Sequence, residues 1–130
     1  MLWRDGFCRI VRAASGDYPG FCRVILNRHV REMTDLGPAE RARLMGAVFA
    51  CESALRELFD PDKVNLASLG NLVPHLHWHV IARHADDPHF PDPIWAAPRR
   101  PSAAARALRA AVSDAQLGAR LASLLSQHAA

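Results

Sequence analysis

His75-Leu76-His77-Trp78-His79-Val80-Ile81 alternates three imidazoles with apolar side chains, a period of two residues. Successive side chains of an extended strand point to opposite faces, so this pattern predicts a strand with all three histidines on one face. The apolar side chains between them would then pack on the other face. At a rise of ~3.3 Å per residue, neighbouring histidines would lie roughly 6–7 Å apart. A phosphate group with its ester oxygens could bridge that distance.

Short apolar runs elsewhere in the chain predict further strands. Residues 7–12 and 21–26 flank a segment rich in turn-forming residues, so they are expected to pair as an antiparallel hairpin. Residues 64–69 form a third predicted strand, and residues 74–83, which carry the histidines, form a fourth. Gly70-Asn71 between these two predicts a tight turn.

One long helix is predicted between the second and third strands. Gly37 or Thr34 can cap it, Pro38 suits its first turn, and the helix would end before Asp60-Pro61. Apolar residues recur at three- and four-residue spacing along it, namely Leu44, Val48, Cys51, Leu55, Leu58 and Phe59. Such a stripe is typical of a helix that packs against a sheet.

The last third of the chain has a different character. Residues 84–101 contain five prolines, which predicts an irregular surface segment. Ser102 then caps a helical tail that Ser113-Asp114 or Gly118 could break into two pieces. We therefore expect an α+β fold: an antiparallel meander sheet, one long helix and a C-terminal helical extension. Residues 1–100 would form the main domain and residues 101–130 the extension.

Composition narrows the classes of function. The chain has 130 residues, 50% of them hydrophobic and 22% charged, which is ordinary for a globular domain. No apolar run approaches the roughly 20 residues that cross a bilayer, and the first residues lack a secretory signal. A cytoplasmic protein without a membrane partner is expected. The net charge of +3 suits a small anionic substrate but is too weak for a groove that binds a nucleic-acid polymer.

The cysteines do not indicate a disulfide framework or a thiolate zinc site. The chain has three cysteines, an odd number, and no two of them are spaced as Cys-x-x-Cys: Cys8, Cys22 and Cys51. Cys8 and Cys22 lie inside apolar strand patterns. We interpret them as small buried thiols.

The histidine row admits three interpretations. Three buried imidazoles without a function would need three sets of hydrogen-bond partners, which is costly. A His-x-His strand could also hold zinc if His29, Asp86 or Asp87 supplied a further ligand. In the third interpretation, a neutral imidazole attacks phosphorus while its neighbours stabilise the developing charge on the phosphate oxygens. Single histidines elsewhere, His84, His89 and His128, are expected to be structural.

The same residues resemble the signature of the histidine-triad (HIT) family, His-φ-His-φ-His-φ-φ, in which φ is apolar. The resemblance extends over about residues 1–95. Residues 18–30 look like the family's hairpin strand, in which Pro-Gly precedes an apolar run that ends in a basic residue and a histidine. Here that last pair is Arg28-His29. Asn65, Gly70 and Asn71 lie where the family has an Asn and a Gly-Gln. Pro74 and Trp78 resemble a small bacterial subgroup described as dinucleoside polyphosphate hydrolases.

This resemblance implies a site and a mechanism. His77 would be the nucleophile that forms a nucleotidyl-histidine at an α-phosphate. His75 and His79 would orient it, bind phosphate oxygens and assist the leaving group. Asn65, Gly70 and Asn71 would line the phosphate end. The family chemistry needs neither a metal nor a cofactor, and its members are commonly homodimers.

Some positions depart from the family pattern and keep alternatives open. Phe21 stands where many relatives have a fourth histidine, and Leu72 stands where a hydroxyl residue is common. The expected substrates are dinucleoside polyphosphates or nucleoside phosphoramidates. The alternatives are a nucleotide-binding protein with little or no turnover and a histidine-based metal-binding module. We expect His29 to be a local hydrogen-bonding group and Trp95 to pack over the sheet or a partner subunit.

Overall fold

The computed structural model describes residues 1–127, so His128 lies outside the described residues. Five antiparallel strands form one sheet in the order β1-β2-β3-β5-β4. Their bounds are Trp3–Arg4 for β1, Cys8–Arg12 for β2, Phe21–Leu26 for β3, Lys63–Ala67 for β4 and His77–Arg83 for β5. The α+β class and the antiparallel meander are thereby confirmed.

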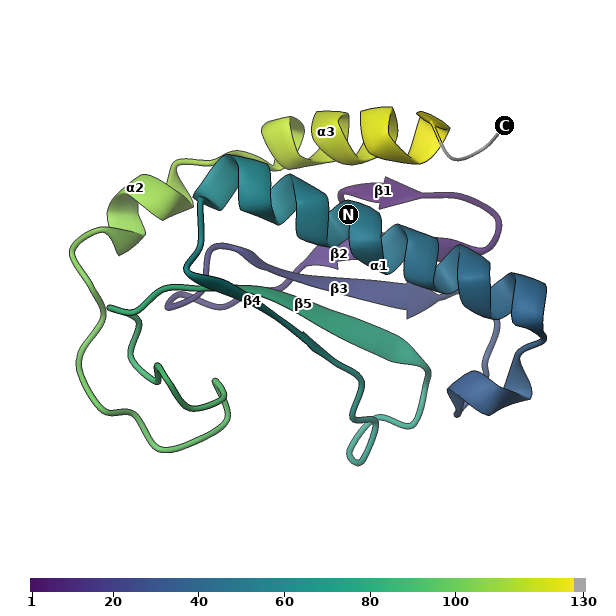
Figure 1. Cartoon of the computed structure of the whole chain (residues 1–130), viewed down its shortest axis with the longest axis horizontal. Coiled ribbons are helices and arrows are strands. Elements are labelled where there is room, and N and C mark those ends of the chain that lie inside the picture. Colours follow the sequence, from purple (N-terminus) through teal and green to yellow (C-terminus); the bar gives the residue numbers. More distant parts are fainter. Residues whose placement is uncertain (128–130) are drawn as a thin grey trace.

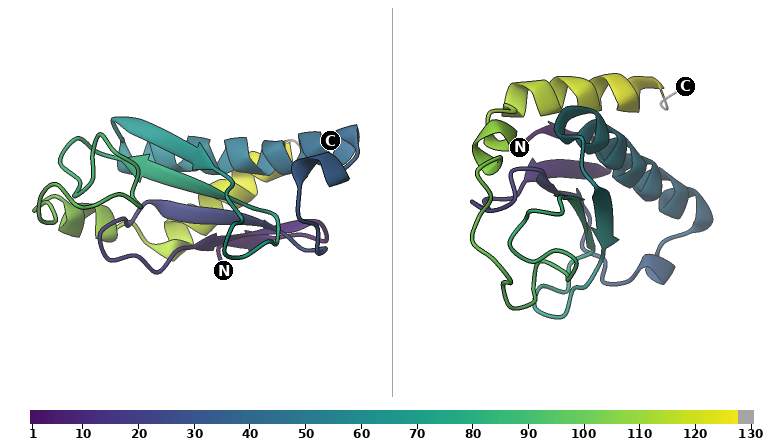
Figure 2. Two further views of the ribbon diagram at one scale, coloured as in Figure 1. Left: turned by 90° about the horizontal axis from the view of Figure 1, so that it is seen from below. Right: turned by 60° about the vertical axis from the view of Figure 1, so that its left-hand side comes forward.

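Helices cover one face of this sheet (Figure 1). The long helix α1, Pro38–Phe59, crosses β3 and β5 and has Gly37 as its N-cap, with Pro38 in the first turn. A short 3-10 helix, η1 (Met33–Asp35), precedes it. The tail forms α2 (Arg106–Ala110) and α3 (Asp114–Gln127). Helix α3 lies beside α1 and contacts β1, as the second view in Figure 2 shows.

The core lies between α1 and the covered face of the sheet. The predicted apolar stripe of α1 faces inward, with Leu44, Val48 and Leu55 fully buried. From the sheet side, alternate residues of the central strands complete the core: Cys22, Val24 and Leu26 of β3, and Val80 and Ala82 of β5. Cys8, Cys22 and Cys51 are all buried and free, which confirms the prediction of buried thiols for Cys8 and Cys22. Because the even-numbered residues of β3 and β5 face the helix, the odd-numbered residues face away from it.

The main difference from the prediction lies between β4 and β5. A tight turn at Gly70-Asn71 was expected, but both strands are shorter than predicted and residues 68–76 form an irregular connection. His75 therefore precedes its strand rather than lying in it. The two-residue strand β1 was also missed, because so short an element has no periodic pattern. The predicted break of the tail at Ser113-Asp114 is confirmed, whereas Gly118 lies within α3.

No helix within residues 1–127 is both long enough and apolar enough to span a membrane.

Candidate active site

The open face of the sheet carries His77 and His79 and forms the floor of a cleft. In the pairing of β3 with β5, His77 lies opposite Ile25 and His79 lies opposite Arg23. A cleft of about 620 Å³ opens above these positions. The irregular connection between β4 and β5 forms one wall of it, and Trp95 lies at its rim. All three histidines of the triad line this cleft.

One hydrogen bond of His77 fixes which ring nitrogen carries the proton in the neutral ring. Its Nδ1 lies 2.6 Å from the backbone carbonyl oxygen of His75. A carbonyl oxygen can only accept a hydrogen bond, so Nδ1 carries the proton. In the neutral ring, Nε2 therefore keeps its lone pair, and no group within residues 1–127 hydrogen-bonds to it. The side chain of His77 also lines the cleft.

His75 connects the triad to a fourth histidine. Its Nε2 donates to the carbonyl oxygen of Leu26 at 2.6 Å, and its Nδ1 lies 3.0 Å from Nδ1 of His29. Two ring nitrogens at that distance share one proton, so a neutral His75 accepts it from His29. We interpreted His29 from the sequence as a local hydrogen-bonding group. In the structure His29 bonds to His75, a member of the triad. The two residues lie 46 positions apart, so no local sequence pattern could predict this contact.

His79 is held in a nearly dry aromatic pocket. The residue is only 7% exposed. Its ring lies 5.6 Å from the ring of Phe21, 5.2 Å from Trp95 and 4.9 Å from His77. Burial, followed by the nearby charges of His77 and Arg23, lowers the pKa of His79 to about 4. His79 is therefore neutral at pH 7 and can act there as an N–H donor rather than as a cation.

The connection before the triad supplies two of the other predicted residues. Gly70 adopts the left-handed conformation with φ 73°, which glycine reaches without strain. Gly70 and Asn71 both line the cleft, while Leu72 is 94% exposed at its edge. The structure thus brings together the triad, Gly70 and Asn71.

Asn65 lies away from this group. It pairs with Ile81 on β5, one pair further along the open face than His79. Its amide oxygen accepts a hydrogen bond of 2.8 Å from Nη1 of Arg83. In this structure Asn65 thus contacts the residues that support the cleft and does not line it.

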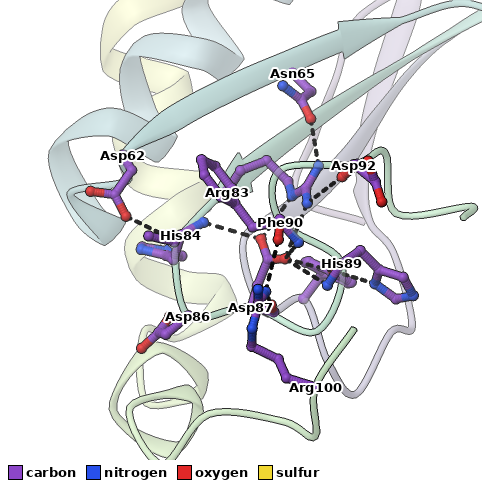
Figure 3. Close-up of polar contacts among 12 residues, drawn as sticks. Asp62, Asn65, Arg83, His84, Asp86, Asp87, His89, Phe90, Asp92 and Arg100 are labelled. Atoms are coloured by element: carbon purple, nitrogen blue, oxygen red, sulfur yellow. Dashed lines mark hydrogen bonds and ion pairs between the residues drawn. The ribbon is translucent and has the colours of Figure 1, made fainter. Parts of the chain in front are cut away.

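A buried ion pair holds the segment that carries Trp95 (Figure 3). Arg83 is 2% exposed, and its Nε and Nη2 contact the two carboxylate oxygens of Asp87 at 2.8 and 3.1 Å. Burial alone would raise the pKa of Asp87. Hydrogen bonds from Arg83 and from the backbone amides of His84, His89 and Phe90 instead lower it well below its ordinary value.

Other parts of the chain complete this cluster. The Tyr18 hydroxyl donates to Asp87 at 3.1 Å, and Arg83 Nη2 donates to the carbonyl oxygen of Asp92 at 2.7 Å. Arg100 donates to the carbonyl oxygens of Asp87 and Phe90. These bonds hold residues 84–100 against the sheet, and the half-exposed ring of Trp95 lies 5.2 Å from the ring of His79. The sequence marked this segment only as irregular, because its anchor comes from residues distant in the chain.

No three His, Cys, Asp or Glu side chains in the described part of the chain are arranged to hold a metal ion. The geometry therefore gives no support to the metal-binding alternative.

Comparison with known proteins agrees with the fold and the histidine pattern. A sequence profile described as HIT domain matches residues 1–86. A histidine triad protein from Marinobacter aquaeolei superposes with a TM-score of 0.72 at 30% identity, covering 97% of this chain and 88% of that one. A histidine triad protein from Bradyrhizobium japonicum gives a TM-score of 0.72 at 28% identity, covering 94% and 87% of the two chains. No curated protein matches the chain.

Proposed function

This chain belongs to the HIT domain family, and on that premise we propose that it is a nucleotide phosphohydrolase or nucleotidyl transferase acting through a covalent nucleotidyl-histidine at His77. The observation that carries the proposal is the hydrogen bond from His77 Nδ1 to the carbonyl of His75. In the neutral ring it leaves Nε2 without a hydrogen-bond partner among residues 1–127, on a side chain that lines the cleft. The family fold suggests nucleotide binding with hydrolase or transferase activity. Dinucleoside polyphosphates and nucleoside phosphoramidates are the proposed substrates.

The proposed reaction has two displacements. The Nε2 lone pair attacks the α-phosphorus, forming a P–N bond as the bond to the leaving oxygen or nitrogen breaks and its electron pair leaves with that atom. The leaving group takes a proton from a neighbouring N–H donor or from water. Water, or another acceptor in a transfer, then attacks phosphorus and loses a proton. The P–N bond breaks, and its electron pair returns to Nε2.

The neighbouring residues have supporting roles in this scheme. His75 holds the backbone carbonyl that orients His77, and neutral His79 donates an N–H toward the phosphate oxygens. Gly70 permits close approach of the backbone to the phosphate, and Asn71 supplies an amide donor. Asn65 was expected at the phosphate end. Its role in this scheme is instead to accept a hydrogen bond from Arg83, which holds the segment beside the cleft.

Replacing the nucleophile tests the mechanism. We expect His77→Asn to reduce the release of AMP from diadenosine tetraphosphate and from adenosine phosphoramidate by about 10³-fold or more. The affinity for AMP, measured by calorimetry, should change little, which controls for misfolding. Quenching the wild-type enzyme in alkali with labelled substrate should trap a phosphorus–histidine adduct that the variant does not form. Wild-type turnover without any adduct, or an active variant, would contradict the proposal.

A binding protein with little turnover is the second candidate. Phe21 favours it, because its ring packs against His79 where many relatives have a fourth histidine. Wild-type protein that binds AMP but turns over neither substrate would establish this alternative. We further propose a homodimer, as in many members of the family. Sedimentation equilibrium tests it, and a single-chain mass at micromolar concentration would refute it.

A further inference from the structure

We propose that Arg23, Arg9 and Arg4 form a second anion-binding subsite that holds phosphate groups beyond the one attacked by His77. The inference rests on the proposed function and narrows its substrate class. It favours nucleotides with a polyphosphate chain over nucleotides with a single phosphate.

The strand register places these arginines in line with the triad. Arg23 lies directly opposite His79, and Arg9 lies opposite Ile25, which in turn lies opposite His77. Arg4 on β1 lies opposite Arg9. Directly opposed residues of antiparallel strands share a face, so all three arginines belong to the open face with His77 and His79.

The distances fit a chain of phosphates. Neighbouring strands lie ~4.8 Å apart, and three such intervals separate β5 from β1, as the strands of Figure 1 show. Arg4 and Arg9 thus share a cross-strand row with His77, and roughly 14 Å separates the backbone of His77 from that of Arg4. Arg9 and Arg23 line the same cleft as the histidines, and Arg4 is exposed beyond its edge.

Among the residues that the structure describes, these three arginines have no carboxylate partner, whereas seven of the twelve other arginines have one. Seven other arginines form ion pairs with Asp or Glu: Arg12, Arg28, Arg43, Arg83, Arg99, Arg109 and Arg120. Within residues 1–127, Arg4, Arg9 and Arg23 form none. Arg23 lies over the Phe21 ring at 5.1 Å, and Arg9 donates to the amide oxygen of Asn27 at 3.1 Å. No Asp or Glu is among the described residues that line the cleft.

Such an arrangement is unfavourable without an anion. Like charges directly opposite one another on paired strands are destabilising, and Arg4 and Arg9 are opposite. Arg9 and Arg23 are diagonal neighbours, about 7–8 Å apart. Phosphate oxygens would offset this repulsion through charge-assisted and bidentate hydrogen bonds, for which guanidinium groups are well suited. A group of only three arginines suits a small polyphosphate. The net charge of the chain, only +3, does not indicate a site for a nucleic-acid polymer.

The test compares two substrates that differ in phosphate number. Diadenosine tetraphosphate carries a chain of phosphates, whereas adenosine phosphoramidate carries one. We expect Arg9→Gln, Arg23→Gln and the double variant to lower kcat/KM for the tetraphosphate at least about tenfold more than for the phosphoramidate. The wild-type KM for the tetraphosphate should also rise more steeply with salt than that of the double variant. Arg120→Gln, on the helical side of the molecule, removes one charge as a matched control and should leave both activities as in the wild type.

The outcomes separate this inference from the proposed function. An equal loss on both substrates in the double variant would overturn the subsite and leave the His77 mechanism standing. Turnover of neither substrate by the wild type would overturn the mechanism. In that case, calorimetry that measures the affinities for inorganic tripolyphosphate and for orthophosphate tests whether the subsite exists. Preferential tripolyphosphate binding that the double variant loses supports it, and binding that the variant retains refutes it.

Discussion

His79 combines burial with the nearby charge of Arg23, and its protonation should therefore control part of the stability of the fold. An unfolded histidine has a pKa of ~6.5, whereas the pKa of folded His79 is about 4. Above pH ~6.5 the ring is neutral in both states, and below that value the unfolded state binds a proton first. The free energy of unfolding should therefore fall from pH ~6.5 down to about 4, by at most about 3 kcal/mol from this residue. Urea denaturation across that range measures it.

The matched variant isolates the contribution of His79. Burial also lowers the pKa of His84, so His84 contributes to the pH dependence of the free energy of unfolding in the same direction. His79→Phe removes only the first component, and we expect its stability to depend less steeply on pH. Identical slopes in the two proteins would show that His79 remains uncharged in both states or charges equally in both.

At the residue scale, the sequence predicted that His77 and His79 share one strand face because strand periodicity is a local property, whereas His75 precedes the strand. The resemblance to the HIT family implied Gly70 and Asn71 as site residues, and both line the cleft. The sequence did not predict the bond between His29 and His75, because that bond depends on the way two chain segments meet at the end of the sheet. It likewise did not predict that Arg4, Arg9 and Arg23 share the face of the histidines, because that placement depends on the register of three strand pairs.

Among the elements, the irregular segment of residues 84–100 depends most on one interaction, the buried pair of Arg83 and Asp87. We expect Asp87→Asn to lower the free energy of unfolding by about 3–5 kcal/mol, because it leaves the Arg83 charge buried without its partner. Asp86→Asn is the matched control. Asp86 pairs at the surface with Arg109, and its loss should cost less than about 1 kcal/mol. Urea titrations that gave equal losses for the two variants would contradict this role of the buried pair.

The predictability of the elements follows from the same distinction between local and distant causes. Strand β3 and helix α1 were predicted well, since an apolar alternation and an apolar stripe are each complete within one segment. The connection between β4 and β5 was predicted too short. A glycine followed by an asparagine indicates a turn, but it does not show at which residues the pairing of β4 with β5 ends. The cluster around Arg83 draws on Tyr18, Asn65 and Arg100, and no local pattern relates these positions.

At the scale of the whole molecule, the C-terminal helix joins the first strand to the main core. Leu117 and Leu121 of α3 are fully buried in the same cluster as the residues of α1. Separate units at residues 1–100 and 101–130 stay a prediction about the organisation of the chain. The packing adds that α3 closes the covered face of the sheet beside α1, over the short strand β1.

Two glycines test this closure by opposite responses to the same substitution. A Cβ at Gly118 would lie 2.9 Å from the backbone carbonyl oxygen of Leu2, whereas a Cβ at Gly46 in α1 would meet nothing within 4 Å. Alanine favours a helix over glycine by about 1 kcal/mol, so Gly46→Ala should raise the free energy of unfolding by up to that amount. Gly118→Ala should instead lower it by about 1–2 kcal/mol, because the overpacked helix must move away from the N-terminal strand. Chemical denaturation in which both variants gained stability would mean that α3 does not pack this closely against the start of the chain.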